Sequence, residues 1–536
     1  MTDTAGADTA SDTTAAAAAD AAATSTSGTT TTAGTTEAVS AVARGGALNL
    51  VGSVIYGVAN FGLLVVLNRV LGTASAGIVL VAIAIFSIAA TIAQIGASTG
   101  LIRTISRLRA VDEGEALPAT VRIGVLPVVV AGVVLAGVLV ALAEPLAGLL
   151  ADGPKTEVVA HILRAMAPFL PFAALHSVAV QATRGFDTMK PQVFIERIGR
   201  ALSLPVVVVI ATGVGMGPIG VGVAWAATNV VALAFSTIAL QRRVHRAVAA
   251  TGRPALPPTR TMARSFWSFT APRAIGQTAE VAVNWLDTII VGILITTTAA
   301  GIYASGTRYL LPGIYAAEAL MQVTGPRISG LLTRGETAEA SNLLKVVAGW
   351  QTAVMWPIYI LTALFPTPLL LLFGKEVVAA RGALVALSVA MLIAAPVGPV
   401  ASVILMSGRS RQAMFNTLVL VAVNVGGNLL FVPDHGITAA GWVWGATILV
   451  AALLPGIQAH RSLHVATLGR PAFVAAGLAA ATVGVVAAIA RLTIGDTLGG
   501  LSVATSLGAL AYLVGLRLLR APLHLDALWN GIRRRS

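Results

Sequence analysis

Cysteine is absent from the 536-residue chain, and only 11% of the residues carry a charge. The chain can therefore form no disulfide framework and no thiolate zinc site, and thiol chemistry is excluded. Because soluble domains are about 25% charged, the composition argues against a soluble enzyme. The 56% content of apolar residues also excludes a largely disordered protein.

Motifs that would power or catalyse a reaction are missing as well. No glycine-rich loop ends in Gly-Lys-Ser or Gly-Lys-Thr, so the chain has no ATP motor of its own. No catalytic constellation and no set of metal ligands stands out. We therefore expect a protein that is not an enzyme and holds no cofactor or metal, with H⁺ or Na⁺ as a coupling ion if one is used.

The first 43 residues differ from the rest. They are mostly Thr, Ala, Ser, Gly and Asp, with five acidic residues and no Lys or Arg. Such a segment cannot bury enough apolar surface to offset its ordering entropy, so we expect residues 1–43 to be a disordered cytoplasmic tail. The segment lacks the basic start and the Leu/Val-rich core of a signal peptide.

Long apolar runs fill most of the remaining sequence. Runs of about 20 residues can cross the hydrocarbon core of a bilayer as helices. They are continuous and lack the in/out alternation of barrel strands, so we predict an all-α membrane protein. The fourteen predicted spans are 46–70, 77–102, 121–143, 157–183, 191–213, 218–241, 265–295, 301–324, 346–372, 378–407, 412–432, 436–458, 471–490 and 498–519.

The basic residues predict how the chain crosses the membrane. If the tail is cytoplasmic and the connections alternate, 27 of the 35 Lys and Arg residues lie on the cytoplasmic side and 5 on the outer side. This asymmetry is typical of a multi-pass protein of the cell (inner) membrane with both termini in the cytoplasm. The net charge of +13 is spread over many connections, so it indicates membrane lipids as partners and no nucleic acid.

The sequence repeats itself. Residues 73–78 (Thr-Ala-Ser-Ala-Gly-Ile) resemble residues 297–302 (Thr-Thr-Ala-Ala-Gly-Ile) at an offset of 224, and residues 217–228 resemble residues 436–447 at an offset of 219. Each repeat holds six spans, an even number, so the repeats are parallel and predict a bilobed, V-shaped transporter. The predicted organisation is a first lobe over 44–246, a basic cytoplasmic linker over 247–264, a second lobe over 265–463, and two extra helices with a basic tail over 464–536.

Polar side chains recur at helical spacing on the first two spans of each repeat and form one stripe on each helix. Stripes of Ser, Asn and Gln fit either hydrogen bonds between packed helices or a wet cavity. Three ionisable residues on one face of the seventh span favour a wet cavity, because each is costly at the bilayer centre. The predicted substrate-cavity residues are Asn49, Ser53, Tyr56, Asn60, Ser87, Thr91, Gln94, Arg273, Gln277, Asn284, Arg308, Tyr315, Glu318 and Gln322.

Depth in the membrane predicts ion pairs between the seventh and eighth spans. Asp287 and Arg308 lie at similar distances from the outer ends of these spans, and Arg273 and Glu318 are level near the inner side. We predict the pairs Asp287–Arg308 and Arg273–Glu318. Glu280 is then left near the midplane, where it could carry a proton or hold Na⁺, or simply accept hydrogen bonds from neighbouring amides. Glu280 and Asp287 are the candidate ion-coupling residues.

Several short motifs together resemble those of a known family. They are Leu67-Asn68-Arg69-Val70-Leu71-Gly72 followed by Ala76-Gly77-Ile78, Trp285 through Gly292, Ala300-Gly301-Ile302-Tyr303, Pro326-Arg327-Ile328-Ser329, Leu372-Phe373-Gly374-Lys375 and Asn428 through Gly441. By their order and spacing, residues 45–465 resemble the polysaccharide-type flippases of the multidrug/oligosaccharidyl-lipid/polysaccharide (MOP) exporter superfamily.

This resemblance implies export of an undecaprenyl-diphosphate-linked oligosaccharide from the cytoplasmic to the outer leaflet, for cell-surface polysaccharide biosynthesis. It further implies that Arg308 and Arg273 engage the diphosphate. The chain departs from the related lipid II flippases because its first span lacks an Arg-Asp pair, which argues against a peptidoglycan precursor as the substrate.

Two other functions fit the same features. A cation-coupled multidrug exporter of this superfamily would show apolar and aromatic cavity walls with unpaired carboxylates. A non-transporting membrane scaffold of a polysaccharide assembly complex would show the polar stripes packed tightly against one another. Beyond the lipid-linked oligosaccharide and membrane lipids, a polysaccharide polymerase or a glycosyltransferase is a candidate partner.

Overall fold

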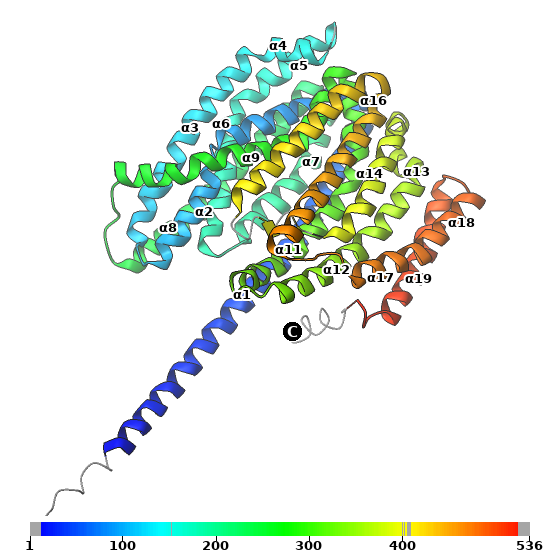
Figure 1. The fold of residues 1–536 in the computed structure, drawn as a ribbon. Helices are drawn as coiled ribbons and strands as arrows, with labels where there is room; N and C mark the ends of the chain where they lie inside the picture. Colours follow the sequence, from blue (N-terminus) through cyan, green and yellow to red (C-terminus); the bar gives the residue numbers. More distant parts are fainter. Residues whose placement is uncertain (1–11, 152, 399, 401–402, 405–408, 524–536) are drawn as a thin grey trace, which may run out of the picture.

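The computed structural model describes residues 12–523 except 152, 399, 401–402 and 405–408, with side chains from Gly52 onward outside some short stretches. Every element of secondary structure in this part of the chain is helical, which confirms the predicted all-α class. The helices form a two-lobed bundle with a small carboxy-terminal group of helices at one side (Figure 1).

The first lobe is built from the elements up to residue 251. They are α1 (Asp12–Ala93), α2 (Ala97–Ala110), η1 (Gly114–Ala116), α3 (Leu117–Ala141), α4 (Ala143–Leu150), α5 (Pro154–Met166), η2 (Ala167–Phe169), α6 (Leu170–Ala182), η3 (Thr183–Phe186), the π-helix η4 (Gln192–Arg200), α7 (Ala201–Gly213) and α8 (Pro218–Thr251). Proline at the first turn of several of these helices suits its fixed φ and missing N–H.

The second lobe and the extra helices follow. They are α9 (Arg260–Leu294), α10 (Thr297–Gly306), η5 (Thr307–Leu310), α11 (Leu311–Thr333), α12 (Thr337–Leu364), α13 (Pro366–Leu371), η6 (Lys375–Ala380), α14 (Arg381–Ala394), η7 (Ala395–Val397), α16 (Ser410–Leu463), α17 (Arg470–Ala479), the π-helix η8 (Ala480–Gly484), α18 (Val485–Thr493) and α19 (Leu498–Leu518). Thr259, Thr296 and Thr497 cap the starts of α9, α10 and α19, because each side-chain oxygen accepts a hydrogen bond from a backbone N–H of the first turn.

Nine helices in the described part of the chain are long and apolar enough to cross a membrane. Gln412–Leu463 contains two of the predicted spans and Gly52–Ala93 contains most of two others, because each joins two helices across a kink at a glycine. Gly72 has φ 77° and Gly436 has φ 63°, a left-handed conformation that side chains with a Cβ rarely adopt. The predicted spans 191–213, 265–295 and 301–324 lie on helices outside this set of nine, so the count of fourteen remains a prediction.

The amino-terminal part of α1 differs from the prediction. Residues 12–43, expected to be disordered, continue α1 here and project away from the bundle (Figure 1). Their high alanine content favours a helix locally. An isolated helix gains no stability from tertiary packing.

The two repeats meet through a reciprocal contact between glycines. A Cβ added to Gly77 would lie 2.1 Å from the carbonyl oxygen of Thr297, and a Cβ added to Gly301 would lie 3.2 Å from that of Thr73 and 2.5 Å from the Gly77 Cα. Gly301 and Thr297 are the repeat equivalents of Gly77 and Thr73, so each lobe makes the same contact with the other. Such isologous contacts are what a two-fold relation between the lobes requires.

The helices run between two ends of the bundle. We call the end with Ser53, Arg109 and Arg246 the tail end, since the projecting part of α1 leaves there, and the end with Gly72 and Leu371 the far end. α19 ends on the side from which α1 projects (Figure 1). The helices α17–α19 pack against α12 through a separate apolar cluster.

At the far end the lobes are tied together. The Asn68 amide donates to Ser305 Oγ over 2.8 Å. The Arg69 guanidinium donates to the carbonyl oxygens of Leu371 and Leu372 over 2.6 and 3.1 Å. One continuous hydrophobic core joins residues of both lobes there, so the structure is closed at its far end.

Candidate functional site

Arg308 stands out at the junction of the two lobes. It lies in the short 3₁₀ turn η5 between α10 and α11, and its guanidinium carbon is 5.4 Å from the centre of the Trp285 ring, within cation–π range. Its buried Nε has no hydrogen-bond partner. Among the described side chains no carboxylate forms a direct ion pair with it, and Asp287 interacts with it only at longer range, so Arg308 is a partly buried cation without a direct carboxylate partner among these residues.

Two tyrosines from opposite lobes lie in the surroundings of Arg308. Tyr56 of α1 and Tyr315 of α11 meet edge to face, with their ring centres 6.0 Å apart. Both are close enough to Arg308 to interact with it electrostatically. Asn60, one helical turn after Tyr56, donates its amide to the Tyr56 carbonyl oxygen over 3.0 Å. The structure thus brings the predicted residues Tyr56, Arg308 and Tyr315 together with Trp285, which the sequence analysis had not assigned to the cavity.

The predicted Asp287–Arg308 ion pair does not form as a direct contact between the two side chains in this structure. Asp287 is buried, and its carboxylate accepts hydrogen bonds from the Tyr303 hydroxyl over 2.9 Å and from the Thr288 backbone N–H over 2.7 Å. Tyr303 and Arg308 are five residues apart, which places them about 140° apart around a helix. Equal depth in the membrane was therefore not enough to bring Asp287 and Arg308 into contact, because Tyr303 points toward Asp287 and Arg308 points toward Trp285.

Gln94 links the two lobes on the tail-end side of this site. Its side-chain oxygen accepts hydrogen bonds from Ser98 over 2.7 Å, from Ser177 over 3.3 Å and from Gln277 over 3.4 Å. Gln277 belongs to α9 of the second lobe, so the polar stripes of the second and seventh spans meet here. This contact matches the hydrogen-bonded packing that the sequence left open as an alternative to a wet cavity.

The other predicted residues fall into two groups. Ser53 is buried and accepts a hydrogen bond from Arg197, Thr91 donates to the Ser87 carbonyl oxygen of its own helix, and Glu318 is exposed. The second group has side chains outside the described residues: Asn49, Arg273, Glu280, Asn284 and Gln322. The Arg273–Glu318 pair and the coupling role of Glu280 therefore stay predictions.

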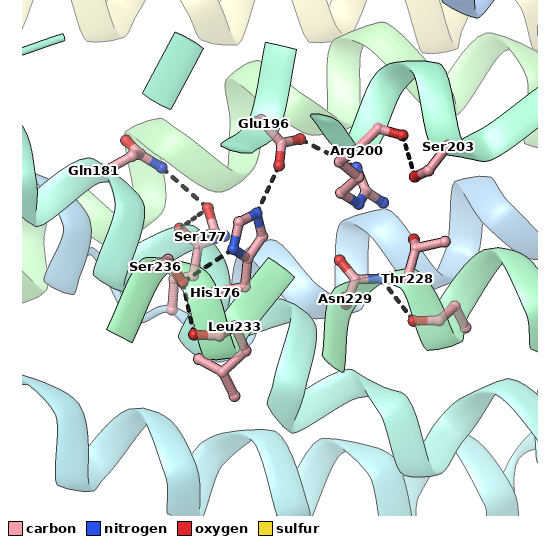
Figure 2. Close-up of polar contacts among 12 residues, drawn as sticks. His176, Ser177, Gln181, Glu196, Arg200, Ser203, Thr228, Asn229, Leu233 and Ser236 are labelled. Carbon is pink, nitrogen blue, oxygen red and sulfur yellow. Dashed lines mark hydrogen bonds and ion pairs between the residues drawn. The ribbon is translucent and has the colours of Figure 1, made fainter. Parts of the chain in front are cut away.

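A second polar cluster lies inside the first lobe and was not assigned from the sequence. Figure 2 shows His176 of α6 between Glu196 of η4 and Ser236 of α8. The His176 Nε2 is 2.6 Å from Glu196 Oε2, and its Nδ1 is 3.2 Å from Ser236 Oγ. The other Glu196 oxygen accepts from Arg200 over 3.0 Å, and the Arg200 guanidinium faces the Trp225 ring at 5.3 Å.

This cluster joins three helices through a buried charge network. His176 is satisfied by its neighbours. Arg200 lies within the predicted span 191–213, and its side chain is only 12% exposed. The spacing of Glu196 and Arg200 by four residues within an apolar run was the signal that could have revealed the pair. Their helix η4 is a π-helix, a form that often marks functional sites.

Metal ligands do not gather anywhere in the described part of the chain, since no group of three His, Asp or Glu side chains there could hold a metal ion. The chemistry available at the lobe junction is that of a cation flanked by aromatic rings. Such a site can bind an anion bearing several oxygens through charge-assisted hydrogen bonds.

The chain matches a family model described as "Polysaccharide biosynthesis protein" over residues 42–332, more than half of its length. No curated protein matches the sequence. The structure resembles "Lipid II flippase MurJ, inward closed conformation" with a TM-score of 0.65 and 12% identity, covering 88% of this chain and 99% of that one.

Two other solved structures share the fold. One is "Inward-facing conformation of a multidrug resistance MATE family transporter of the MOP superfamily", with a TM-score of 0.56, 13% identity, and coverage of 77% of this chain and 94% of that one. The other is a MOP superfamily transporter from Pyrococcus furiosus whose title reports a binding pocket of reverse polarity, with a TM-score of 0.53, 13% identity, and coverage of 79% and 95%.

Proposed function

Because the chain belongs to the polysaccharide biosynthesis protein family, among the membrane transporters of the MOP superfamily, we propose that it moves a lipid-linked oligosaccharide across the membrane. The substrate class is an oligosaccharide carried on a polyprenyl diphosphate. It crosses from the cytoplasmic to the outer leaflet while its lipid tail stays in the bilayer.

Arg308 is the observation that carries this proposal. Among the described side chains this guanidinium has no direct carboxylate partner, which is expensive inside a membrane protein, so we infer that its partner is the transported anion. A diphosphate offers the paired oxygens that a guanidinium binds in bidentate fashion. Trp285, Tyr56 and Tyr315 supply flat apolar faces and hydroxyls beside it, a combination suited to sugar rings.

The same charge argues against a cationic drug as the substrate. Asp287 is already engaged by Tyr303 and Thr288, and Glu318, the other described carboxylate near the site, is exposed. A cationic drug would therefore meet an arginine without a direct carboxylate partner among the described residues of the lobe junction. We assign the tail end to the cytoplasm, because most of the cations lie on the predicted connections at that end.

Reconstituted transport tests the proposal. The full chain is placed in liposomes with a fluorescent undecaprenyl-diphosphate oligosaccharide, and arrival of the sugar in the opposite leaflet is measured. We expect Arg308→Gln to lose most of the transport. Arg308→Lys should keep an intermediate rate, because a lysine ammonium binds a diphosphate less well than the planar guanidinium, which can form two parallel hydrogen bonds.

Arg491→Gln is the matched control. Arg491 is also an arginine of an apolar helix, but it pairs with Asp496 over 2.8 Å in the extra helices, away from the lobe junction. We expect its transport to be unchanged. Transport by Arg308→Gln at the wild-type rate would overturn the assignment of the site. Export of cationic drugs without any movement of the sugar lipid would show a multidrug exporter instead.

A further inference from the structure

A hollow at the tail end of the first lobe has an unusual charge. Its volume is about 620 Å³, and it lies between the end of α2, the connection from η3 to η4 and the end of α8. The charged residues that line it are Arg109, Asp112, Lys190, Arg243 and Arg246. Four cations from three segments of the chain thus face one carboxylate.

Most of these cations have no carboxylate partner. Arg109 is held by Asp187 over 2.7 Å and by the Gly185 carbonyl oxygen over 3.0 Å. Lys190, Arg243 and Arg246 form no ion pair with any carboxylate among the described residues. The Arg243 guanidinium donates to the Ala239 carbonyl oxygen over 2.7 Å, which fixes its position without neutralising its charge.

A neighbouring hollow at the tail end has a smaller excess of cations over carboxylates. It has nearly the same volume, about 610 Å³, and lies on the other side of α2. Its three cations, Arg103, Arg107 and Arg253, face the carboxylates Glu113 and Glu115, and Arg253 pairs with Glu115 over 3.2 Å. The first hollow therefore carries the larger excess of positive charge.

The surface of α8 indicates what kind of anion reaches the first hollow. Val231, Phe235 and Ile238 are 60%, 59% and 45% exposed and lie on one face of the helix, as their spacing of four and three residues requires. Arg242 continues this face and Arg246 lies next to it one turn later. An apolar stripe that ends in arginines matches a lipid, with its acyl chain along the helix and its head group at the end.

We propose that the hollow formed by Arg109, Lys190, Arg243 and Arg246 binds the phosphate-bearing head group of a lipid, whose acyl chain lies along α8. The head group belongs either to an anionic phospholipid of the bilayer or to a polyprenyl diphosphate, since both carry phosphate on a long apolar chain. The site is separate from Arg308 and does not depend on the transport proposed above.

Native mass spectrometry of the full chain in detergent measures the binding directly. The probes are phosphatidylglycerol, undecaprenyl diphosphate, inorganic pyrophosphate and neutral phosphatidylcholine. The test variant is Arg243→Gln/Arg246→Gln. The matched control is Arg260→Gln/Arg264→Gln, which removes two exposed cations from the start of α9, outside the hollow. Arg243→Lys/Arg246→Lys keeps the charge.

We expect the test variant to bind the anionic lipids about 25-fold more weakly, about fivefold for each cation lost, with phosphatidylcholine unaffected. The control and the Lys variant should bind within about twofold of the wild type. A loss confined to phosphatidylglycerol assigns the site to bilayer phospholipid, and a loss confined to undecaprenyl diphosphate assigns it to the polyprenyl lipid.

Three outcomes overturn the proposal. These are equal binding by the wild type and the test variant, an equal loss in the control, and a loss seen for inorganic pyrophosphate but for neither lipid. Arg246→Gln alone, at an exposed position, keeps the test valid if the double variant does not fold. Phosphatidylglycerol binding by Arg308→Gln should be normal, and undecaprenyl diphosphate is compared in the Arg308→Gln background with and without Arg243→Gln/Arg246→Gln, so this proposal and the transport proposal can fail independently.

Discussion

The contact between Gly77 and Gly301 predicts how the far end opens. In Gly77→Ala the new methyl carbon would lie 2.1 Å from the Thr297 carbonyl oxygen, whereas ordinary contacts begin at 3.4 Å. Because this neighbour is backbone, it cannot move aside as a flexible side chain would. The helices α1 and α10 must therefore separate by about 1 Å at this point.

The cost of this overlap falls only on conformations in which the far end is closed. Overpacking of this kind costs about 1–3 kcal/mol, which corresponds to a shift of about 5- to 150-fold between two conformations. We therefore expect Gly77→Ala to favour an open far end. Gly301→Ala, its repeat equivalent, should act in the same direction, since its methyl carbon would lie 2.5 Å from the Gly77 Cα.

Opening of the far end can be measured by chemical labelling of one introduced cysteine, because the chain has no cysteine of its own. Ser305→Cys introduces the single thiol of the chain at a fully buried position beside Asn68. The rate of its reaction with a membrane-impermeant maleimide then reports opening of the far end. We expect the rate to rise about 5- to 150-fold when Gly77→Ala is added.

Gly148→Ala is the control, since a Cβ there meets no atom within 4 Å. It should leave the labelling rate unchanged. The reasoning is refuted if Gly77→Ala folds normally, as judged by thermal unfolding, and labels no faster than the parent. It is equally refuted if Gly148→Ala raises the rate as much.

Three further predictions concern the buried polar groups. Glu196→Gln should lower the free energy of unfolding by about 3–5 kcal/mol, because it breaks a buried ion pair and weakens the contact with His176; thermal unfolding in detergent measures this, and an unchanged midpoint would contradict it. Tyr303→Phe removes the hydroxyl that donates to Asp287 and should lower the free energy of unfolding by about 1.5–3 kcal/mol in the same assay. An unchanged midpoint would contradict this and would mean that the Asp287 carboxyl does not need this donor. Glu280→Gln should make transport insensitive to an imposed pH or Na⁺ gradient, and normal gradient dependence would exclude Glu280 as the coupling residue.

Much of the fold could be predicted because it depends on patterns along the chain. Continuous apolar runs require helices in a bilayer, since every backbone polar group must be satisfied within the segment. The offset of 224 residues placed Gly77 and Gly301 at equivalent positions, and the structure shows them in direct contact across the two lobes. Helical spacing also identified Tyr56, Arg308 and Tyr315, which lie near one another at the lobe junction.

Other features could not be derived from those patterns. Depth along the helix placed Asp287 level with Arg308, but the carboxylate is bound by Tyr303. Arg200 was not singled out within the predicted span 191–213, yet η4 carries it into the first lobe beside Glu196. In both cases the direction of a side chain around its helix, and the helix it faces, decided the outcome.

The sequence by itself determined the class of the molecule, its apolar helices, its internal repeat and the asymmetry of its cations, because each depends on composition and spacing within one segment. The tertiary structure alone decided which charges are paired. It surrounded Asp287 with hydrogen-bond donors and paired Arg200 with Glu196, and it left Arg308, Arg243 and Arg246 without direct carboxylate partners among the described residues. A charge inside a protein is compensated by whatever groups packing brings within a few ångströms of it, and those groups come from helices far apart in the chain.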